Sequence, residues 1–452
     1  MEAPELEKRI GITTYASETL PIGGRIRSQV EDFKVEEVLI DGSIATMEPQ
    51  TYEQIEGEGS YLLTVLVKSQ WDNILSLKRI ARELHISNRR VALAGLKDAK
   101  ASTSQYITFK DVNPAEVRRI HIPGIKVIPQ RHVEEPISAS MLWGNRFQIV
   151  VRDLKYPRNE LEALINCTER EVEKAGGFLN FYGHQRFGTI RPVTHEVGKH
   201  LVKGNIARAA LIFLAESTPN EHQIARQARE NLANSLDYKK ALKEFPYHLT
   251  YERSMLHHLA EKPRDFLGAF RQLPITLCRL FVQAYSAYLF NRTLNRLLDE
   301  RSLTLCEVGD YILKLEPVGS PRLQKAVKVT KENRSALAVE LAEGKLVLAL
   351  PVLGYLYNPS SDRINAEVRD ILEEEGVSIT DFKVKHLPEV KTLGKLRAAI
   401  IQANDLNYII PKSETSEEYS TVTFHFSLPK GSYATVVLRE FMKSQNPISA
   451  GF

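Results

Sequence analysis

Residues 95–105 read GLKDAKASTSQ, and this stretch indicates more about the fold and chemistry of the chain than any other. The preceding residues 90–94, RVALA, have the composition of a short buried strand, and a glycine then marks a turn. Asp98 therefore lies just past the end of a strand, where its carboxylate can face a cleft. Lys97 and Lys100 place positive charge beside it, which favours an ionised carboxylate. A surface turn with ordinary charges is the alternative interpretation.

Further blocks of sequence share the character of this loop: glycines, aromatic residues and a few polar side chains at fixed spacing. They are DFKVEE at 32–37, EGEGSYLL at 56–63, GNRF at 144–147, NFYGHQRFG at 180–188, SAYLFN at 286–291 and LPKGSYATVVLRE at 428–440. Together with GLKD at 95–98, and in this order, the blocks resemble the TruD family of pseudouridine synthases. The resemblance spans nearly the whole chain.

The pattern of hydrophobic residues divides the chain into three parts. Alternating and β-branched runs predict strands at 33–39, 61–67, 106–109, 147–151 and 421–427, and a helix starting after 72–73. Helical spacing dominates from about 180 to 404, with 346–350 as a rare strand candidate. A polar stretch at 411–418 resembles a linker or loop. One domain is therefore expected to be inserted into another, so that the first and last segments share a sheet.

In the terms of the family that the chain resembles, the fold is α+β. A mixed-sheet catalytic domain of pseudouridine-synthase type is expected over residues 1–179 and 405–452, and a largely helical inserted domain over 180–404. The 452 residues and the 43% hydrophobic content are sufficient for two or three domains.

Composition restricts the class of protein further. The three cysteines are widely spaced and form no C-x-x-C pair, so neither a disulfide framework nor a zinc ribbon is indicated, and a reducing cytosol fits best. No signal peptide or run of transmembrane length is found, so we expect a cytoplasmic protein that is not bound to membranes. The net charge of +4 permits an acidic partner without requiring one.

The resemblance implies that Asp98 is the essential catalytic residue. Conversion of uridine to pseudouridine breaks the bond between ribose C1′ and N1, turns the uracil and rebonds it through C5, with no redox change and no added group. One carboxylate suffices, either as a nucleophile at C1′ or as a base at C2′. No cofactor and no metal are therefore expected. The family's basic residue corresponds to Arg27, which we expect to pair with Asp98; Lys97 is the alternative partner, although alternation in an extended segment points it away.

The resemblance also places side chains around the uracil. Phe33, Phe147 and Tyr433 are expected to supply aromatic faces, and Asn145 hydrogen bonds to the pyrimidine edge; Lys97 is included among the substrate-binding residues. Taken singly, the two phenylalanines are equally typical of core residues on a strand. Tyr433 replaces the phenylalanine of some family members and adds a hydroxyl group without an assigned role.

The implied partner is tRNA, modified at uridine 13. Lysine and arginine side chains are expected to bind its phosphates, among them Arg186, Arg191, Lys199 and Lys203 at the start of the insertion. No nucleotide cofactor is expected, because the chain lacks a glycine-rich phosphate loop. The oligomeric state is left open by the sequence, with a monomer favoured.

Two other classes of function remain open at this point. A non-catalytic RNA-binding or RNA-chaperone protein of the same fold would lack the aspartate or its basic partner, and both are present. A metal-dependent nuclease using Asp32, Glu36 and Glu37 would need a second cluster of ligands, which the sequence does not offer.

Overall fold

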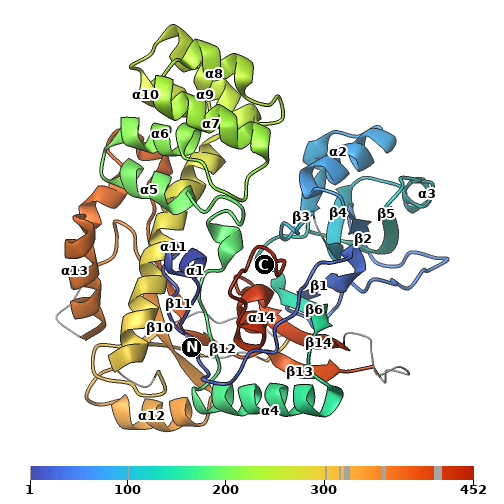
Figure 1. Ribbon diagram of the computed structural model, residues 1–452. Helices are drawn as coiled ribbons and strands as arrows, with labels where there is room; N and C mark the ends of the chain where they lie inside the picture. Colours follow the sequence, from blue (N-terminus) through green and yellow to red (C-terminus); the bar gives the residue numbers. More distant parts are fainter. Residues whose placement is uncertain are drawn as a thin grey trace.

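The computed structural model describes residues 2–99, 101–300, 303–314, 317–319, 326–358, 363–411 and 420–452. A sheet-rich part and a helix-rich part lie side by side in it (Figure 1). Lys100, expected beside Asp98, and nearly all of the stretch predicted as a linker fall outside the described residues. None of the described helices combines the length and the apolar content needed to cross a bilayer.

The main sheet unites the two ends of the chain. Its strands follow the order β13-β14-β6-β1-β4-β2-β5, and β3 pairs with β4 at the side. The bounds are β1 Phe33–Leu39, β2 Tyr61–Ser69, β3 Val91–Leu93, β4 Ser102–Lys110, β5 Ile125–Val133, β6 Leu142–Leu154, β13 Asn404–Ile409 and β14 Ser420–Pro429. Only β1 and β4 run parallel among these pairs, so the sheet is mixed. The predicted sharing of one sheet by the first and last segments is confirmed.

Local sequence explains where the elements of this part begin. Helix α2, Asn73–Glu83, starts where expected because the side chain of Asp72 accepts a hydrogen bond from the backbone N–H of Leu75 at 3.0 Å. Residues 33–37 of β1 alternate between buried and half-buried, as its period-two pattern predicts, and the two residues that follow are both buried. Helices α3, Pro114–Arg118, α4, Arg158–Lys174, and α14, Ala434–Met442, complete this part.

One face of the main sheet carries rows of side chains fixed by strand register. Val35 of β1 lies opposite Phe147 of β6 and Thr103 of β4, and Phe147 lies opposite Phe426 of β14. These residues share a hydrophobic core with α4 and α14, in which Phe424 packs on Phe441 at 4.9 Å between ring centroids. The same face therefore holds both the core and several side chains expected at the site.

Helices make up most of the predicted insertion. They are α5 Thr194–Val202, α6 Ile206–Ala215, α7 Gln223–Ser235, α8 Tyr238–Glu244, α9 Thr250–Glu261, α10 Phe266–Phe270, α11 Ile275–Glu300, α12 Arg334–Ala342 and α13 Arg363–Glu375. Helix α11 runs through the middle of this part (Figure 1), and Leu289, Phe290 and Leu294 on it are fully buried. Its length and burial follow from the helical spacing in the sequence.

The insertion also contains a small sheet that the sequence predicts only in part. Its order is β11-β10-β8-β9, with β8 at Tyr311–Lys314, β9 at Val327–Lys328, β10 at Leu346–Val352 and β11 at Lys395–Ala398. Only β10 was expected, at 346–350, because its apolar run is continuous, and in the structure all its residues are buried. The neighbouring strands are short and partly polar, so their conformation depends on pairing with β10 rather than on local pattern.

The two connections between the parts lie together. Ile400–Ile401 (β12) pairs antiparallel with Phe178–Leu179 (β7), next to the expected domain boundaries at 180 and 404, which this pairing supports but which remain proposed. The N-terminal segment, including α1, Glu5–Lys8, packs against the helical part: Ile10 and Ile12 belong to its core, and Asn291 donates a hydrogen bond to the carbonyl of Ile10 at 2.9 Å.

A buried ion pair fixes this N-terminal segment to α14. Arg439 Nε donates to Glu7 Oε2 at 2.8 Å, and their side chains are only 4% and 3% exposed. Arg439→Met leaves the buried Glu7 without its arginine partner and with only His184, 3.7 Å away, beside it, and should lower the free energy of unfolding by about 3–5 kcal/mol. The exposed pair Arg79–Glu83 supplies the control, since Arg79→Met should cost only about 0.3–0.5 kcal/mol. Urea unfolding of both variants measures the difference, and similar losses would contradict a special role for the buried pair.

Candidate active site

Asp98 lies on the loop that joins β3 to β4, as the sequence predicts. Its carboxylate Oδ2 lies 3.1 Å from Nη2 of Arg27, and the expected pairing of these two residues is therefore present. The Asp98 side chain is 54% exposed, whereas that of Arg27 is 16% exposed. The carboxylate thus faces outward while the guanidinium behind it is held by the protein.

Three constraints hold Arg27 in this position. Its backbone has φ of 56°, the left-handed region that non-glycine residues rarely adopt and that clusters at functional sites. Its Nη1 donates to the carbonyl of Gly451 at 3.0 Å, and its guanidinium carbon lies 4.1 Å from the centre of the Phe33 ring. Burial lowers the pKa of Arg27, and the charge of Asp98 opposes that shift. The cation is therefore positioned before any substrate arrives.

Gly451 is a site residue that the sequence did not indicate. A Cβ at this position would lie 2.1 Å from the carbonyl oxygen of Ile26, and φ is +88°, so a glycine is required for the close approach. The end of the chain is held there by the backbone N–H of Ile26, which donates to the carbonyl of Ala450 at 2.9 Å. Only the tertiary structure reveals that the C-terminus supports Arg27.

Lys68 supports the loop from the other side and was also missed. It is 1% exposed, and its Nζ donates to the carbonyl oxygens of Trp71 at 2.7 Å and Asp98 at 3.1 Å. Burial lowers its pKa to about 8, although the charges of Asp72 and Asp98 oppose the shift. Its position at the end of β2 gave no sequence signal, because the contact joins segments distant in the chain.

Lys97 does not take the role that the sequence gave it. Its ammonium pairs with Glu37 Oε1 at 2.6 Å, with side chains 5% and 0% exposed. The other oxygen of Glu37 accepts the backbone N–H of Tyr106 at 2.9 Å. The alternation that points Lys97 away from Asp98 thus directs it into the interior. We correct its assignment from substrate binding to a buried structural ion pair.

A floor of polar atoms lies near this loop on the same face of the sheet. Thr103 Oγ1, Gln105 Oε1 and Asn145 Oδ1 are buried and have no hydrogen-bond partner among the described residues. Register places Asn145 opposite Glu37, and Gln105 donates to the carbonyl of Gly95 at 3.2 Å. Buried polar atoms without partners are rare in proteins and point to a ligand or water that completes them.

The two phenylalanines expected at the base lie in the core. Phe33 is 3% exposed and Phe147 is 7% exposed, with ring centroids 6.4 Å apart in an edge-to-face contact. The guanidinium of Arg27 covers Phe33, and Phe426 packs on Phe147 at 5.5 Å. Their burial agrees with the core interpretation that the sequence left open, and contact with a base remains a prediction for both.

Tyr433 lies where the helix-rich part of the chain meets the part built on the main sheet. Its ring contacts that of Tyr182 edge-on at 6.1 Å, and Arg397 lies 4.1 Å from the centre of the Tyr182 ring. Burial raises the pKa of Tyr433; the charges of Arg186 and Arg397 oppose this, and that of Asp98 adds to it. The raised pKa keeps the Tyr433 hydroxyl protonated. Because this hydroxyl forms no hydrogen bond with a described residue, it is available as a donor.

The basic residues expected on the RNA-facing side are used in different ways. Arg191 is 12% exposed and lies 3.8 Å from Glu221 and 3.6 Å from Glu252, while Lys199 pairs with Glu375 at 2.9 Å. These two therefore stabilise the insertion internally. Arg186 donates to Gln283 at 3.1 Å and lies 5.8 Å from the Tyr182 ring, close to the candidate site.

The carboxylates of the nuclease hypothesis are each bound to a different cation. Asp32 pairs with Arg152 at 2.7 Å, Glu36 with Arg146 at 2.5 Å and Glu37 with Lys97. In the part of the chain that the structure describes, no group of three or more His, Cys, Asp or Glu side chains could hold a metal ion. The geometry thus gives the nuclease hypothesis no support.

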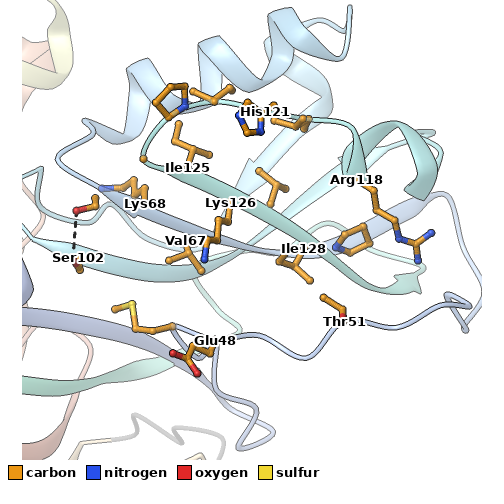
Figure 2. Close-up of a pocket in the computed structure, with 18 of the residues that line it drawn as sticks. Glu48, Thr51, Val67, Lys68, Ser102, Arg118, His121, Ile125, Lys126 and Ile128 are labelled. Atoms are coloured by element: carbon orange, nitrogen blue, oxygen red, sulfur yellow. Dashed lines mark hydrogen bonds between the residues drawn. The ribbon is translucent and has the colours of Figure 1, made fainter.

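A large cavity lies on the opposite face of the sheet from the polar floor. It measures about 860 Å³, and Figure 2 shows Val67, Lys126 and Ile128 of β2 and β5 pointing into it, with Lys68 and Ser102 at one end. Glu31 and Glu48 line it together with Lys126 and Arg118, so its charges are mixed. Neither Asp98 nor Arg27 lines this cavity, so it is not part of the candidate site.

Comparison with known proteins points to one family. The model of the family described as tRNA pseudouridine synthase D (TruD) matches residues 9–441. "Probable tRNA pseudouridine synthase D" of Methanosarcina mazei is 37% identical over 99% of both chains, and that of Thermococcus sibiricus is 35% identical over 95% of this chain and 97% of its own. A crystal structure described as TruD from Methanosarcina mazei superposes with a TM-score of 0.82 at 36% identity, covering 99% of this chain and 100% of the other.

The depressed pKa of Lys68 predicts a stability that depends on pH. Between about pH 8 and the usual lysine value, 10.5, the unfolded chain binds a proton at this position that the folded chain does not. Wild type should therefore gain stability relative to Lys68→Met as pH rises through this range, by at most about 1.4 kcal/mol per pH unit. Thermal unfolding of both proteins at pH 7.5, 9 and 10 measures the difference. A difference that stays constant with pH would show that Lys68 titrates normally.

Proposed function

Because the chain belongs to the TruD family of tRNA pseudouridine synthases, we propose that it isomerises uridine to pseudouridine in tRNA, and that its target is uridine 13. Asp98 is the catalytic carboxylate and Arg27 its basic partner. The enzyme is thus an intramolecular transferase that uses no cofactor, and we propose the cytoplasm as its location.

The observation that carries this proposal is the Asp98–Arg27 pair. A carboxylate exposed on a loop and held 3.1 Å from a guanidinium that is itself fixed by the backbone has the geometry of a preorganised reactive group. RNA that covers the loop excludes water from this pair, and the interaction between the two charges then strengthens.

In the reaction, Asp98 either attacks C1′ or removes the C2′ proton, and N1 leaves with the electrons of the broken bond. The uracil has to turn while it stays bound, so it needs a stacking surface and a few hydrogen bonds rather than a tight cage. We propose that the Tyr433 ring supplies the surface and that Asn145 hydrogen-bonds the pyrimidine edge. Thr103 and Gln105 line the same floor and can contribute further hydrogen bonds.

A non-catalytic RNA-binding protein of the same fold is the alternative. Such a protein has no need for a carboxylate paired with a guanidinium that the backbone holds in place. Asp98 and Arg27 are both present, 3.1 Å apart, and Nη1 of Arg27 donates to the carbonyl of Gly451 at 3.0 Å. The retained pair favours the enzyme.

Asp98→Asn should abolish pseudouridine formation and leave tRNA affinity nearly unchanged, because the side chain keeps its size and only its charge is lost. Asp41→Asn is a matched control: its carboxylate is 49% exposed and pairs with Arg131 at 3.6 Å, away from the candidate site. Mass-shift mapping of the tRNA after incubation measures the product. Appreciable turnover by the purified Asp98→Asn protein would end the assignment of Asp98.

Tyr433→Ala should remove a stacking surface worth about 1–3 kcal/mol, which lowers kcat/KM by roughly 5–150-fold. Tyr433→Phe keeps the ring and should retain most of the activity. Binding of tRNA should weaken less than turnover in both variants, since the rest of the RNA is held elsewhere. If Tyr433→Ala lost activity only in proportion to a loss in unfolding temperature, the residue would be a packing residue.

A further inference from the structure

A groove lies on the surface of α8 and α9, away from the candidate active site. Helices α6 to α10 pack on one another at one end of the helix-rich part, at the top of Figure 1. The groove measures about 460 Å³, and Leu242 of α8, Tyr247 of the α8–α9 loop and Gln272 after α10 border it. Neither Asp98 nor Tyr433 lines it, so it is a separate feature of the surface.

One face of α9 forms the bottom of this groove. The opposite face of the helix is apolar and packs Met255 and Leu259 into the core of the helix-rich part. The residues on the groove side recur at helical spacing and are polar; they are Thr250, Arg253, Ser254, His257 and Glu261. The groove therefore offers hydroxyl, imidazole and guanidinium groups and one carboxylate.

Tyr247 at the edge of the groove is both exposed and fixed. It is 85% exposed, more than any other large apolar or aromatic residue that the structure describes. The guanidinium carbon of Arg253 lies 4.6 Å from the centre of its ring. Arg253 is itself held, because its Nη1 donates to the carbonyls of Leu242 at 2.7 Å and Phe245 at 2.8 Å, where α8 ends. Arg253 thus supports one face of the ring and leaves the other face free.

A ring held in this way suits a flat ligand. An aromatic side chain that a fixed cation already orients loses little freedom when a second ring stacks on it, so the surface is organised before the ligand arrives. Every nucleobase has a face that can stack on an aromatic side chain. Bases inside a duplex are covered by their neighbours, so the base that fits here is an unpaired one. The volume of the groove is within the range of sites that hold small organic molecules.

The charge of the surrounding segment favours RNA as the source of that base. Residues 238–272 contain seven lysines and arginines and four aspartates and glutamates, so they carry most of the net charge of +4. Of these carboxylates, Glu252 is buried and pairs with Arg229 at 2.7 Å. Lys243 and Lys262 are exposed and form no salt bridge with a described residue. An excess of exposed cations attracts the phosphates of a nucleic acid.

We infer that this groove binds an unpaired nucleotide of the tRNA substrate, outside the segment that holds the target uridine. The base stacks on the free face of Tyr247, and the side chains of Thr250, Ser254 and His257 face the ribose and phosphate. The inference rests on the proposed function, because tRNA is the partner to which it commits. It gives α8 and α9 a direct part in holding the RNA.

The first test measures tRNA binding in an Asp98→Asn background, so that no turnover alters the RNA. Tyr247→Ala should weaken binding roughly 5–150-fold, the value of one base stacked on an aromatic ring. The slope of log affinity against log salt should not change, because no charge is removed. Tyr251→Ala is the matched control, since this tyrosine of α9 is 46% exposed and does not line the groove. Equal affinities of the two variants would overturn the inference and leave a protein as the alternative partner.

The length of the RNA separates the groove from the active site. A short hairpin that carries the target uridine should bind Tyr247→Ala and the parent protein equally, because no residue proposed to hold the uridine lines the groove. An equal loss of affinity for the hairpin and for the tRNA would show that Tyr247 acts on the uridine segment or on folding, and would overturn the inference.

The second test uses tryptophan emission and keeps an aromatic ring at the position. The chain has only two tryptophans, so Tyr247→Trp adds emission that can be separated from that of the parent protein. A base that stacks on the new ring should quench this added emission when tRNA is present. Heparin, a polyanion without bases, should leave it unchanged. No quenching by tRNA, or equal quenching by heparin, would overturn the inference.

Pseudouridine formation by wild type, measured on the same tRNA, separates the two proposals. Active wild type together with an unchanged tRNA affinity of Tyr247→Ala would refute the groove as an RNA site and leave the enzyme assignment standing. Inactive wild type, together with quenching of Tyr247→Trp by tRNA but not by heparin, would refute the proposed reaction and support the groove.

Discussion

The antiparallel pairing of β14 with β6 is the constraint on which the rest of the structure depends. These strands lie on opposite sides of the insertion in sequence, and their register sets Phe426 opposite Phe147 and Leu428 opposite Asn145. The chain must therefore leave and re-enter the sheet at nearby points, where β7 and β12 pair. The loop that follows β14 carries Tyr433, and the carbonyl of Gly451 holds Arg27, so the proposed site exists only when both ends of the chain are in place.

Charged groups buried at the joints make this arrangement specific. Glu7 with Arg439, Glu37 with Lys97, and Arg397 with the Asn180 and Gly431 loops each join segments distant in sequence. Such contacts need not add much net stability, because desolvation offsets the attraction. Their effect is that any other packing leaves a charge buried alone. The position of the loop that carries Asp98 is held in this way, by Lys68 below it and Arg27 beside it.

Local pattern was sufficient for much of the fold. It predicts six strands of the main sheet, β1 to β4, β6 and β14, and the start of α2, but neither β5 nor β13. The assignment of Asp98 with Arg27 followed from resemblance. Lys68, Gly451 and the strands beside β10 could not be found in this way, since each depends on a partner far along the chain. Lys97 was misassigned for a related reason: the sequence shows a cation next to Asp98, but the side chain pairs with the buried Glu37, a residue distant in the chain.

The turning of the uracil sets opposite requirements for the base and for the carboxylate in the proposed reaction. Once the bond between N1 and C1′ has broken, the base is held by non-covalent contacts alone, and an aromatic ring such as that of Tyr433 can retain it without fixing its orientation. The carboxylate of Asp98, by contrast, must stay in place relative to the ribose, and Arg27 and Lys68 hold its loop from two sides. A loosely stacked base and a fixed carboxylate are thus complementary requirements of one reaction, and the structure places Tyr433 and Asp98 on separate elements that can meet both.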